Sequence, residues 1–123
     1  MATILTVDDS PSIRQMIKVV LAPAGHTVVE AGDGVEGLAK AKAKAEPVNL
    51  VITDLNMPVM NGIEMIRQLR QVPSCTGVPI LFLSTESDEG MKQQARSAGA
   101  TGWITKPFKP EQLLAVVAKL IRT

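Results

Sequence analysis

Five short apolar runs alternate with five amphipathic segments along this chain of 123 residues, and this alternation limits the possible folds more than any other feature. The runs are short and mostly apolar, as buried strands are: Ile4–Val7, Thr27–Val29, Leu50–Thr53, Ile80–Leu83 and Gly102–Thr105. Strands that alternate with helices over short connections pair in parallel, because each right-handed crossover needs a helix to return the chain. The sequence therefore predicts a single α/β domain over residues 1–123, with a five-stranded parallel sheet doubly wound by five helices.

Capping residues and helix breakers indicate where the helices begin. Ser10-Pro11 predicts the start of the first helix, whose apolar residues recur at helical spacing as far as Leu21. Pro110 predicts the start of the last helix. The second and third helices begin at capping-box patterns, Asp33-Gly34-Val35-Glu36 and Asn61-Gly62-Ile63-Glu64.

Two of the predicted helices have few large apolar residues. The second presents a thin apolar side made mostly of Val35, Leu38, Ala39 and Ala43. The fourth, at about Asp88–Ala98, has Met91 as its only large apolar residue. We expect this fourth helix to be packed most weakly and therefore to shift most easily.

Bulk composition excludes several classes of protein. The chain is 46% hydrophobic and 20% charged with a net charge of +1, which indicates a globular protein with no general affinity for nucleic acid or membrane surfaces. The single cysteine, Cys75, cannot form an internal disulfide, and the N-terminal apolar run is too short for a signal or a transmembrane helix. We expect a monomer in the cytoplasm.

Polar side chains follow four of the five predicted strands, at the point where each strand ends. Asp8 and Asp9 follow the first strand, Asp54 the third, Ser84 the fourth and Lys106 the fifth. Because the carboxyl ends of parallel strands meet at one edge of a sheet, these side chains are expected to converge there. Helix capping explains the acids after the first strand, but it does not explain all five residues together.

The chemistry of this set favours a metal and a phosphoryl group. Carboxylates held close together repel one another unless a hard cation neutralises them, and an oxygen-rich cluster without sulfur suits Mg²⁺ or Mn²⁺. One carboxylate could then attack a phosphoryl group as a nucleophile, while the metal and Lys106 neutralise the transferring oxygens. Ser84 could donate a hydrogen bond to the product.

These residues, in this order and spacing, resemble the receiver domain of two-component response regulators. The resemblance covers Ile4 to Ile121 and is closest to the stand-alone receivers of the CheY type, which have a flavodoxin-like (βα)5 fold. The motifs that carry it are Asp8-Asp9, Asp54 with Asn56-Met57-Pro58 and Asn61-Gly62, Ser84, and Lys106-Pro107-Phe108.

The resemblance implies a role for each matching residue of the acidic pocket. Asp54 would accept a phosphoryl group from a phosphohistidine of a CheA-like sensor histidine kinase. Asp9, Asp54 and the backbone carbonyl of Asn56 would bind Mg²⁺ directly, and Asp8 would act through metal-bound water. Lys106 would form an ion pair with the phosphoryl group, before a cis peptide bond to Pro107.

The resemblance also implies how the signal leaves and ends. Ser84 would move toward the phosphoryl group and Trp103 would repack, which would change a face made of the fourth helix, the fifth strand and the last helix. Asn56 and Glu86 would control how fast water removes the phosphoryl group. Because no output domain follows Thr123, we expect output by contact with another protein, such as the flagellar motor switch, and a phosphatase as a further partner.

Three other functions share parts of this pattern. The chain could be a phosphate sink or a relay intermediate rather than a chemotaxis regulator. An aspartyl-phosphate phosphatase or phosphotransferase acting on small molecules would need a second acid two residues after the nucleophile, where this chain has Asn56. A flavodoxin-like cofactor binder would place a phosphate where Asp8-Asp9 would repel it. We therefore expect a signalling protein that modifies only itself, and not an enzyme acting on other substrates.

Overall fold

The computed structural model describes residues 2–42, 48–54, 60–75, 77–84, 89–106 and 108–121. These residues form one sheet with five parallel strands: β1 (Thr3–Val7), β2 (Thr27–Ala31), β3 (Leu50–Asp54), β4 (Ile80–Ser84) and β5 (Gly102–Thr105). The strand order is β2-β1-β3-β4-β5, so the chain runs outward from β1 to β2 and then returns past β1 to β3. The reversal places the switch point of the strand order at the carboxyl ends of β1 and β3, which is where open parallel sheets bind their ligands.

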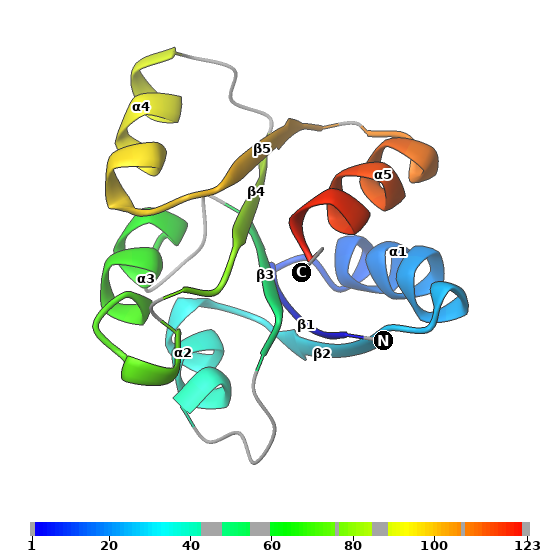
Figure 1. Ribbon diagram of the computed structural model, residues 1–123, viewed down its shortest axis with the longest axis horizontal. Helices are drawn as coiled ribbons and strands as arrows, with labels where there is room; N and C mark the ends of the chain where they lie inside the picture. The colour runs from blue at the N-terminus through cyan, green and yellow to red at the C-terminus, as the bar shows by residue number, and fades with distance from the viewer. Residues whose placement is uncertain are drawn as a thin grey trace.

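Helices cover both faces of the sheet (Figure 1). α1 (Pro11–Leu21) and α5 (Pro110–Leu120) lie on one face, and α2 (Gly34–Lys42), α3 (Gly62–Leu69) and α4 (Glu89–Ala98) lie on the other. Two short 3₁₀ helices, η1 (Ala22–Ala24) and η2 (Pro73–Cys75), follow α1 and α3. The prediction of a doubly wound sheet with five helices is confirmed.

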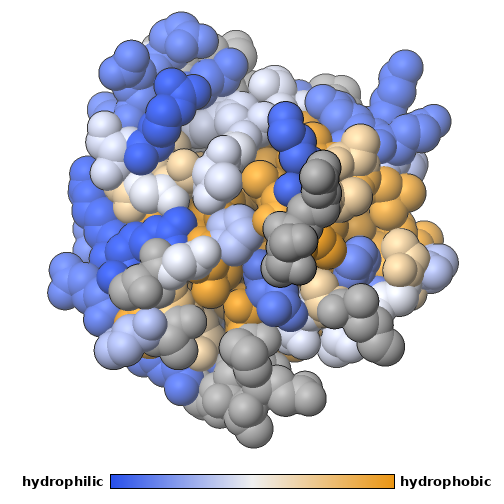
Figure 2. Space-filling model, in the orientation of Figure 1, coloured by the Kyte–Doolittle hydropathy of each residue, from blue (hydrophilic) through white to orange (hydrophobic). Residues whose placement is uncertain are grey.

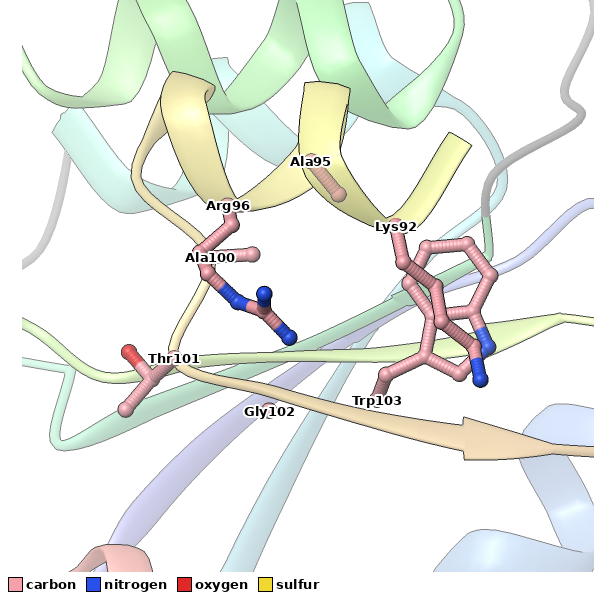
Figure 3. Close-up of a pocket in the computed structure, with 7 residues that line it drawn as sticks. All are labelled: Lys92, Ala95, Arg96, Ala100, Thr101, Gly102 and Trp103. Carbon is pink, nitrogen blue, oxygen red and sulfur yellow. The ribbon is translucent and has the colours of Figure 1, made fainter. Parts of the chain in front are cut away.

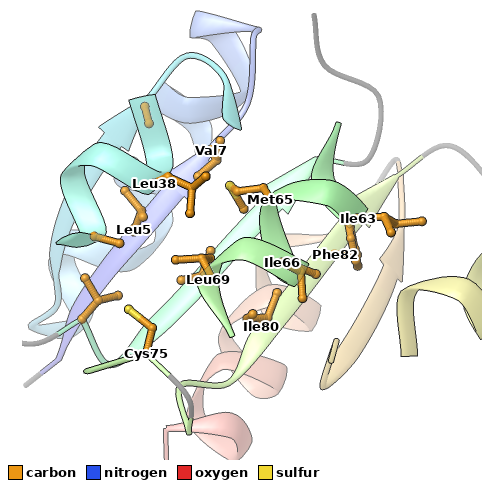
Figure 4. Packing of buried hydrophobic residues seen from close by; sticks show 14 of the residues in the cluster. Leu5, Val7, Leu38, Ile63, Met65, Ile66, Leu69, Cys75, Ile80 and Phe82 are labelled. Atoms are coloured by element: carbon orange, nitrogen blue, oxygen red, sulfur yellow. The ribbon is translucent and has the colours of Figure 1, made fainter. Parts of the chain in front are cut away.

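Each face of the sheet has its own hydrophobic core, because side chains alternate between the two faces along a strand. Val7 and Phe82 belong to the core beneath α2, α3 and α4, which Figure 4 shows from close by. Ile4 and Leu81 belong to the core beneath α1 and α5. Nearly all side chains of the three central strands are buried, which fixes the positions of the strand ends.

Three helices begin where their capping residues predicted. The side-chain oxygens of Ser10 and Asn61 accept the N–H three residues further on, at 3.3 and 2.9 Å, and Asp33 does the same at 2.8 Å. The second half of the capping box at Asp33 is displaced by one residue, since the Glu36 carboxylate accepts the N–H of Gly32 at 2.7 Å. This hydrogen bond lowers the pKa of Glu36, and a salt bridge to Lys40 adds to the effect.

The apolar side predicted for α2 was partly wrong. Val35 is 48% exposed and Ala39 is exposed, whereas Gly37 is buried against β1. A Cβ atom on Gly37 would lie 2.9 Å from Cγ2 of Val7, so the helix approaches the strand too closely for any side chain there. Ala43 lies outside the described residues.

The prediction that α4 has little apolar surface to anchor it is confirmed. Ala95 is the only buried residue of this helix, and Met91 is partly buried against the same core. The described part of the helix spans Glu89–Ala98, and Asp88, where the predicted helix began, lies outside the described residues. Whether α4 shifts remains a prediction.

Exposed apolar side chains gather on α1 and α5. Figure 2 shows hydrophobic residues where α1 and α5 lie and hydrophilic residues over α4. Met16 and Val19 of α1 are 40% and 60% exposed, and Leu114 of α5 is 37% exposed. Along the described residues, helices of the length and apolarity that a membrane crossing requires do not occur.

Candidate functional site

Three carboxylates meet at the carboxyl end of the sheet. Asp8 and Asp9 follow β1, and Asp54 is the last residue of the neighbouring strand β3. One oxygen from each lies within 4.8 Å of the others. Asp8 is buried, Asp54 is partly buried and Asp9 is exposed, so the cluster opens to solvent on the side of Asp9. The predicted meeting of these three acids is confirmed.

Asp8 is held by the surrounding residues through both its backbone and its carboxylate. Its N–H donates to the carbonyl of Ala31 at 3.1 Å, which continues the pairing of β1 with β2. Its Oδ1 accepts the N–H of Ser10 at 2.9 Å, and its Oδ2 accepts from Nζ of Lys106 at 3.3 Å. The side chain is 3% exposed, so these contacts replace most of its hydration.

Lys106 joins two of the three acids. Its Nζ lies 3.3 Å from Oδ2 of Asp8 and 3.6 Å from Oδ1 of Asp54, and its side chain is 16% exposed. Its backbone N–H donates to the carbonyl of Ser84 at 2.8 Å, which extends the pairing of β4 with β5 by one residue. This extension brings a lysine from the edge strand to the acids at the centre of the sheet, as the sequence predicted.

The donor set fits a divalent cation. Three carboxylates and one ammonium leave two negative charges in excess within a small volume. All the ligand atoms of the cluster are oxygens, which are the donors that Mg²⁺ prefers. Asp9 supplies the exposed side from which a hydrated ion could enter.

Ser84 lies at the same edge and is fully buried. It ends β4 one residue beyond Leu83, which is the partner of Asp54 in the register of β3 with β4. Its own partner across the sheet is Thr105, the residue before Lys106. The structure therefore places Ser84 between the strand that carries the candidate nucleophile and the strand that carries the lysine.

Trp103 lies on β5 beside a groove under α4 (Figure 3). Its ring centroid is 5.5 Å from that of Phe82, its partner on β4, with the ring planes at 42°. Lys92 and Arg96 of α4 line the same groove as the indole. The indole thus contacts both the core and the helix predicted to move, while its switching role stays a prediction.

Several predicted site residues cannot be placed. Asn56, Glu86 and Pro107 lie outside the described residues, and so does Thr85, which follows Ser84. The predicted backbone ligand at Asn56 and the cis peptide bond at Pro107 therefore remain predictions.

Sequence reasoning missed two arginines that connect distant segments. Arg14 of α1 reaches both Glu30 on β2 and the backbone of Asp8. Arg70, just after α3, donates to the carbonyl of Gly99 in the turn between α4 and β5. Arg14 lies at helical spacing with the buried residues of α1, where a cation without a partner is unusual. This spacing was the only indication in the sequence that Arg14 makes a structural contact.

The fold and the acidic edge define a class of signalling domain, and comparison with known proteins identifies it. Residues 4–118 match the family described as the response regulator receiver domain. The chain therefore belongs to the receiver domain family of two-component systems, as the resemblance implied.

Within this family the chain is similar to chemotaxis proteins. It is 40% identical over 111 residues to a chemotaxis protein CheY homolog of Campylobacter jejuni, an alignment that covers 89% of this chain and 85% of that protein. The structure of CheY4 of Vibrio cholerae superimposes with a TM-score of 0.92 at 45% identity, covering 98% of both chains. These likenesses support a response regulator of the chemotaxis type.

Other relatives extend the comparison to longer proteins and to metal binding. The chain is 36% identical to the hybrid signal transduction histidine kinase D of Dictyostelium discoideum, of which it spans only 7%. The receiver domain of the Pseudomonas aeruginosa kinase PA1611, with 26% identity and a TM-score of 0.88, holds a magnesium ion in its active-site cleft.

Proposed function

We propose that this protein is a chemotaxis response regulator whose Asp54 accepts a phosphoryl group from a CheA-like sensor histidine kinase in the presence of Mg²⁺. The observation that carries the proposal is the position of Lys106, whose Nζ lies 3.6 Å from Asp54 and 3.3 Å from Asp8 beside a three-carboxylate cluster. The likeness to CheY proteins supports the same conclusion.

Asp54 is a better nucleophile than either neighbour in this arrangement. Both oxygens of Asp8 are engaged and its side chain is almost fully buried. Asp9 is exposed, and solvation weakens a carboxylate as a nucleophile. Asp54 is partly buried with Oδ1 3.6 Å from Nζ of Lys106, so a phosphoryl group attacked by this carboxylate would have an ammonium already beside its oxygens.

The transfer forms one bond and breaks one. An oxygen of Asp54 bonds to phosphorus as the P–N bond of the kinase phosphohistidine breaks, and the departing imidazole nitrogen keeps the electron pair and is neutral or takes up a proton. Negative charge spreads over the phosphoryl oxygens during the transfer. Lys106 is placed to pair with one of them, which stabilises the transition state more than the ground state.

Asp9 and Asp54 would hold Mg²⁺ directly, and Asp8 would hold it through water. A bound divalent cation would supply electrostatic stabilisation to the phosphoryl oxygens and remove the repulsion between the acids. The magnesium ion in the active-site cleft of the PA1611 receiver domain supports the choice of this cation. The backbone carbonyl of Asn56 would complete the ligand set, as the family resemblance implies.

Phosphorylation would be read out at α4 and β5. Ser84 would move toward the phosphoryl group, and the space it leaves would let Trp103 repack against Phe82. Because Ala95 is the only buried residue of α4, a small change at the indole would suffice to move this helix. The altered face would bind a target protein, which we take to be the flagellar motor switch.

The same proposal sets the protein's other properties. It would act in the cytoplasm as a monomer and would use kinase, target and phosphatase as its protein partners. It would catalyse only its own phosphorylation and dephosphorylation, the latter by water under the control of Asn56 and Glu86.

The test combines a small phosphodonor with the single tryptophan. The protein would be treated with Mg²⁺ and acetyl phosphate, and with Mg²⁺ and beryllofluoride, while Trp103 fluorescence is followed and mass spectrometry locates the added group. Asp54→Asn should abolish both the modification and the fluorescence change, whereas Glu111→Gln on the exposed side of α5 should alter neither. Modification that persists in Asp54→Asn would disprove the assignment of the nucleophile.

A further inference from the structure

Arg14 of α1 connects two parts of the structure behind the acidic cluster. Its Nε donates to Oε1 of Glu30 on β2 at 3.1 Å, and its Nη1 donates to the backbone carbonyl of Asp8 at 2.5 Å. The Arg14 side chain is 19% exposed, so both contacts are made in a largely desolvated setting. Hydrogen bonds from a charged donor are strong under such conditions.

The carbonyl that Arg14 contacts belongs to the peptide unit between Asp8 and Asp9. Because a peptide unit is planar, holding this carbonyl also sets the direction of the following N–H and of the bonds to both Cα atoms. Asp8 is held in addition at its N–H and its carboxylate, whereas Asp9 is exposed and makes no comparable hydrogen bond with the other residues that the structure describes. Among the described residues, Arg14 is therefore the side chain that orients the peptide unit leading to Asp9.

Glu30 holds the guanidinium in place. It lies on β2 opposite Thr6, and its own backbone carbonyl accepts a hydrogen bond from Lys40 of α2. Lys40 also pairs with Glu36 at 3.3 Å. The guanidinium of Arg14 is thus fixed to β2, and β2 to α2, which gives the peptide unit after Asp8 a rigid support.

We propose that Arg14 is a positioning residue for divalent-cation binding: it orients the Asp8–Asp9 peptide so that both carboxylates face the same ion. The inference rests on the metal site of the proposed function. A simple electrostatic view predicts the opposite effect, because a guanidinium near an acidic site repels a cation and its removal should strengthen binding. Loss of positioning would weaken Mg²⁺ binding and loss of repulsion would strengthen it, so the change in the dissociation constant distinguishes the two.

The experiment is a titration with MgCl₂ by isothermal calorimetry, at constant ionic strength and well below the unfolding temperature of each variant. Arg14→Met should raise the Mg²⁺ dissociation constant by about tenfold, the lower end of what loss of a group that orients metal ligands costs. Arg14→Lys retains the charge but lacks the planar fork that reaches both Glu30 and Asp8, so it should also weaken binding. Lys18→Met removes the same charge from an exposed position on the same helix and should leave the dissociation constant unchanged or slightly lower.

Arg14→Lys keeps the inference testable if Arg14→Met does not fold, because electrostatics alone predicts no change for it. Unchanged or tighter Mg²⁺ binding by the folded Arg14 variants would refute the positioning role while leaving the metal site intact. A wild-type protein without saturable Mg²⁺ binding, or an Asp9→Asn variant with unaltered affinity, would instead refute the metal site of the proposed function and the positioning role with it.

Discussion

Replacing Arg70 with methionine should destabilise the protein by about 3 kcal/mol, because one guanidinium joins three segments of backbone. Nη1 of Arg70 donates to the carbonyls of Cys75 at 3.0 Å and Val78 at 2.7 Å, and Nη2 donates to the carbonyl of Gly99 at 2.6 Å. These contacts connect the end of α3 to the segment before β4 and to the turn between α4 and β5. Gly99 has φ of 118°, and a Cβ atom there would lie 2.7 Å from Nε of Arg70.

The expected loss in the free energy of unfolding follows from these three hydrogen bonds and from the desolvation of the guanidinium. A hydrogen bond from a charged donor contributes about 1.5–3 kcal/mol, so three contribute roughly 4.5–9 kcal/mol if nothing replaces them. Two effects reduce this sum. The charged guanidinium is partly buried and gives up hydration in the folded state, which also lowers the pKa of Arg70. The site is also only partly buried, so water reaches the freed carbonyls in the variant.

The assay is urea unfolding followed by far-UV circular dichroism and by Trp103 fluorescence. Arg67→Met is the matched control, because Arg67 lies on α3, its side chain is 58% exposed and it pairs with Glu64 at 3.9 Å. The control should change the free energy of unfolding by no more than about 0.5 kcal/mol. If Arg70→Met lowers the free energy of unfolding no more than the control does, the three hydrogen bonds contribute little to stability.

Two further predictions concern the lysine of the site and the single histidine. Lys106→Ala should retain Mg²⁺ binding but lose the change in Trp103 fluorescence that beryllofluoride, as a phosphoryl analogue, induces. A full fluorescence response would show that Lys106 does not couple the phosphorylation site to Trp103. Burial lowers the pKa of His26, so the unfolded chain takes up its proton at higher pH than the folded chain. Stability should therefore fall as the pH drops through about 6.5, and His26→Gln should reduce this fall in urea unfolding; an unaltered pH dependence would assign it to other groups.

Most of the fold could be predicted, because strand and helix are distinguished by the period of apolar residues along the chain. All five strands lie within two residues of their predicted positions. The error in α2 has a physical cause. Val35 looked like a core residue by its chemistry, but the helix lies so close to β1 that Gly37 faces the strand and Val35 turns to solvent.

The acids, Ser84 and Lys106 could also be predicted, since each follows a buried strand and parallel strands end at one edge. What could not be predicted was which of them touch. Lys106 contacts Asp8 across 98 residues of sequence, and only the placement of β4 and β5 beside β3 brings them together.

The sequence by itself determined the alternation of strands and helices and the identity of the residues at the strand ends, because both depend on neighbours along the chain. Only the tertiary structure decided the strand order, the approach of α2 to β1, and the contacts of Arg14 and Arg70. Those contacts join residues distant in sequence, and no local period of apolar or charged residues encodes them. The hydrogen bonds of Arg14 to Glu30 and to the Asp8 carbonyl therefore depend on β2 and α1 lying side by side, which only the tertiary structure shows.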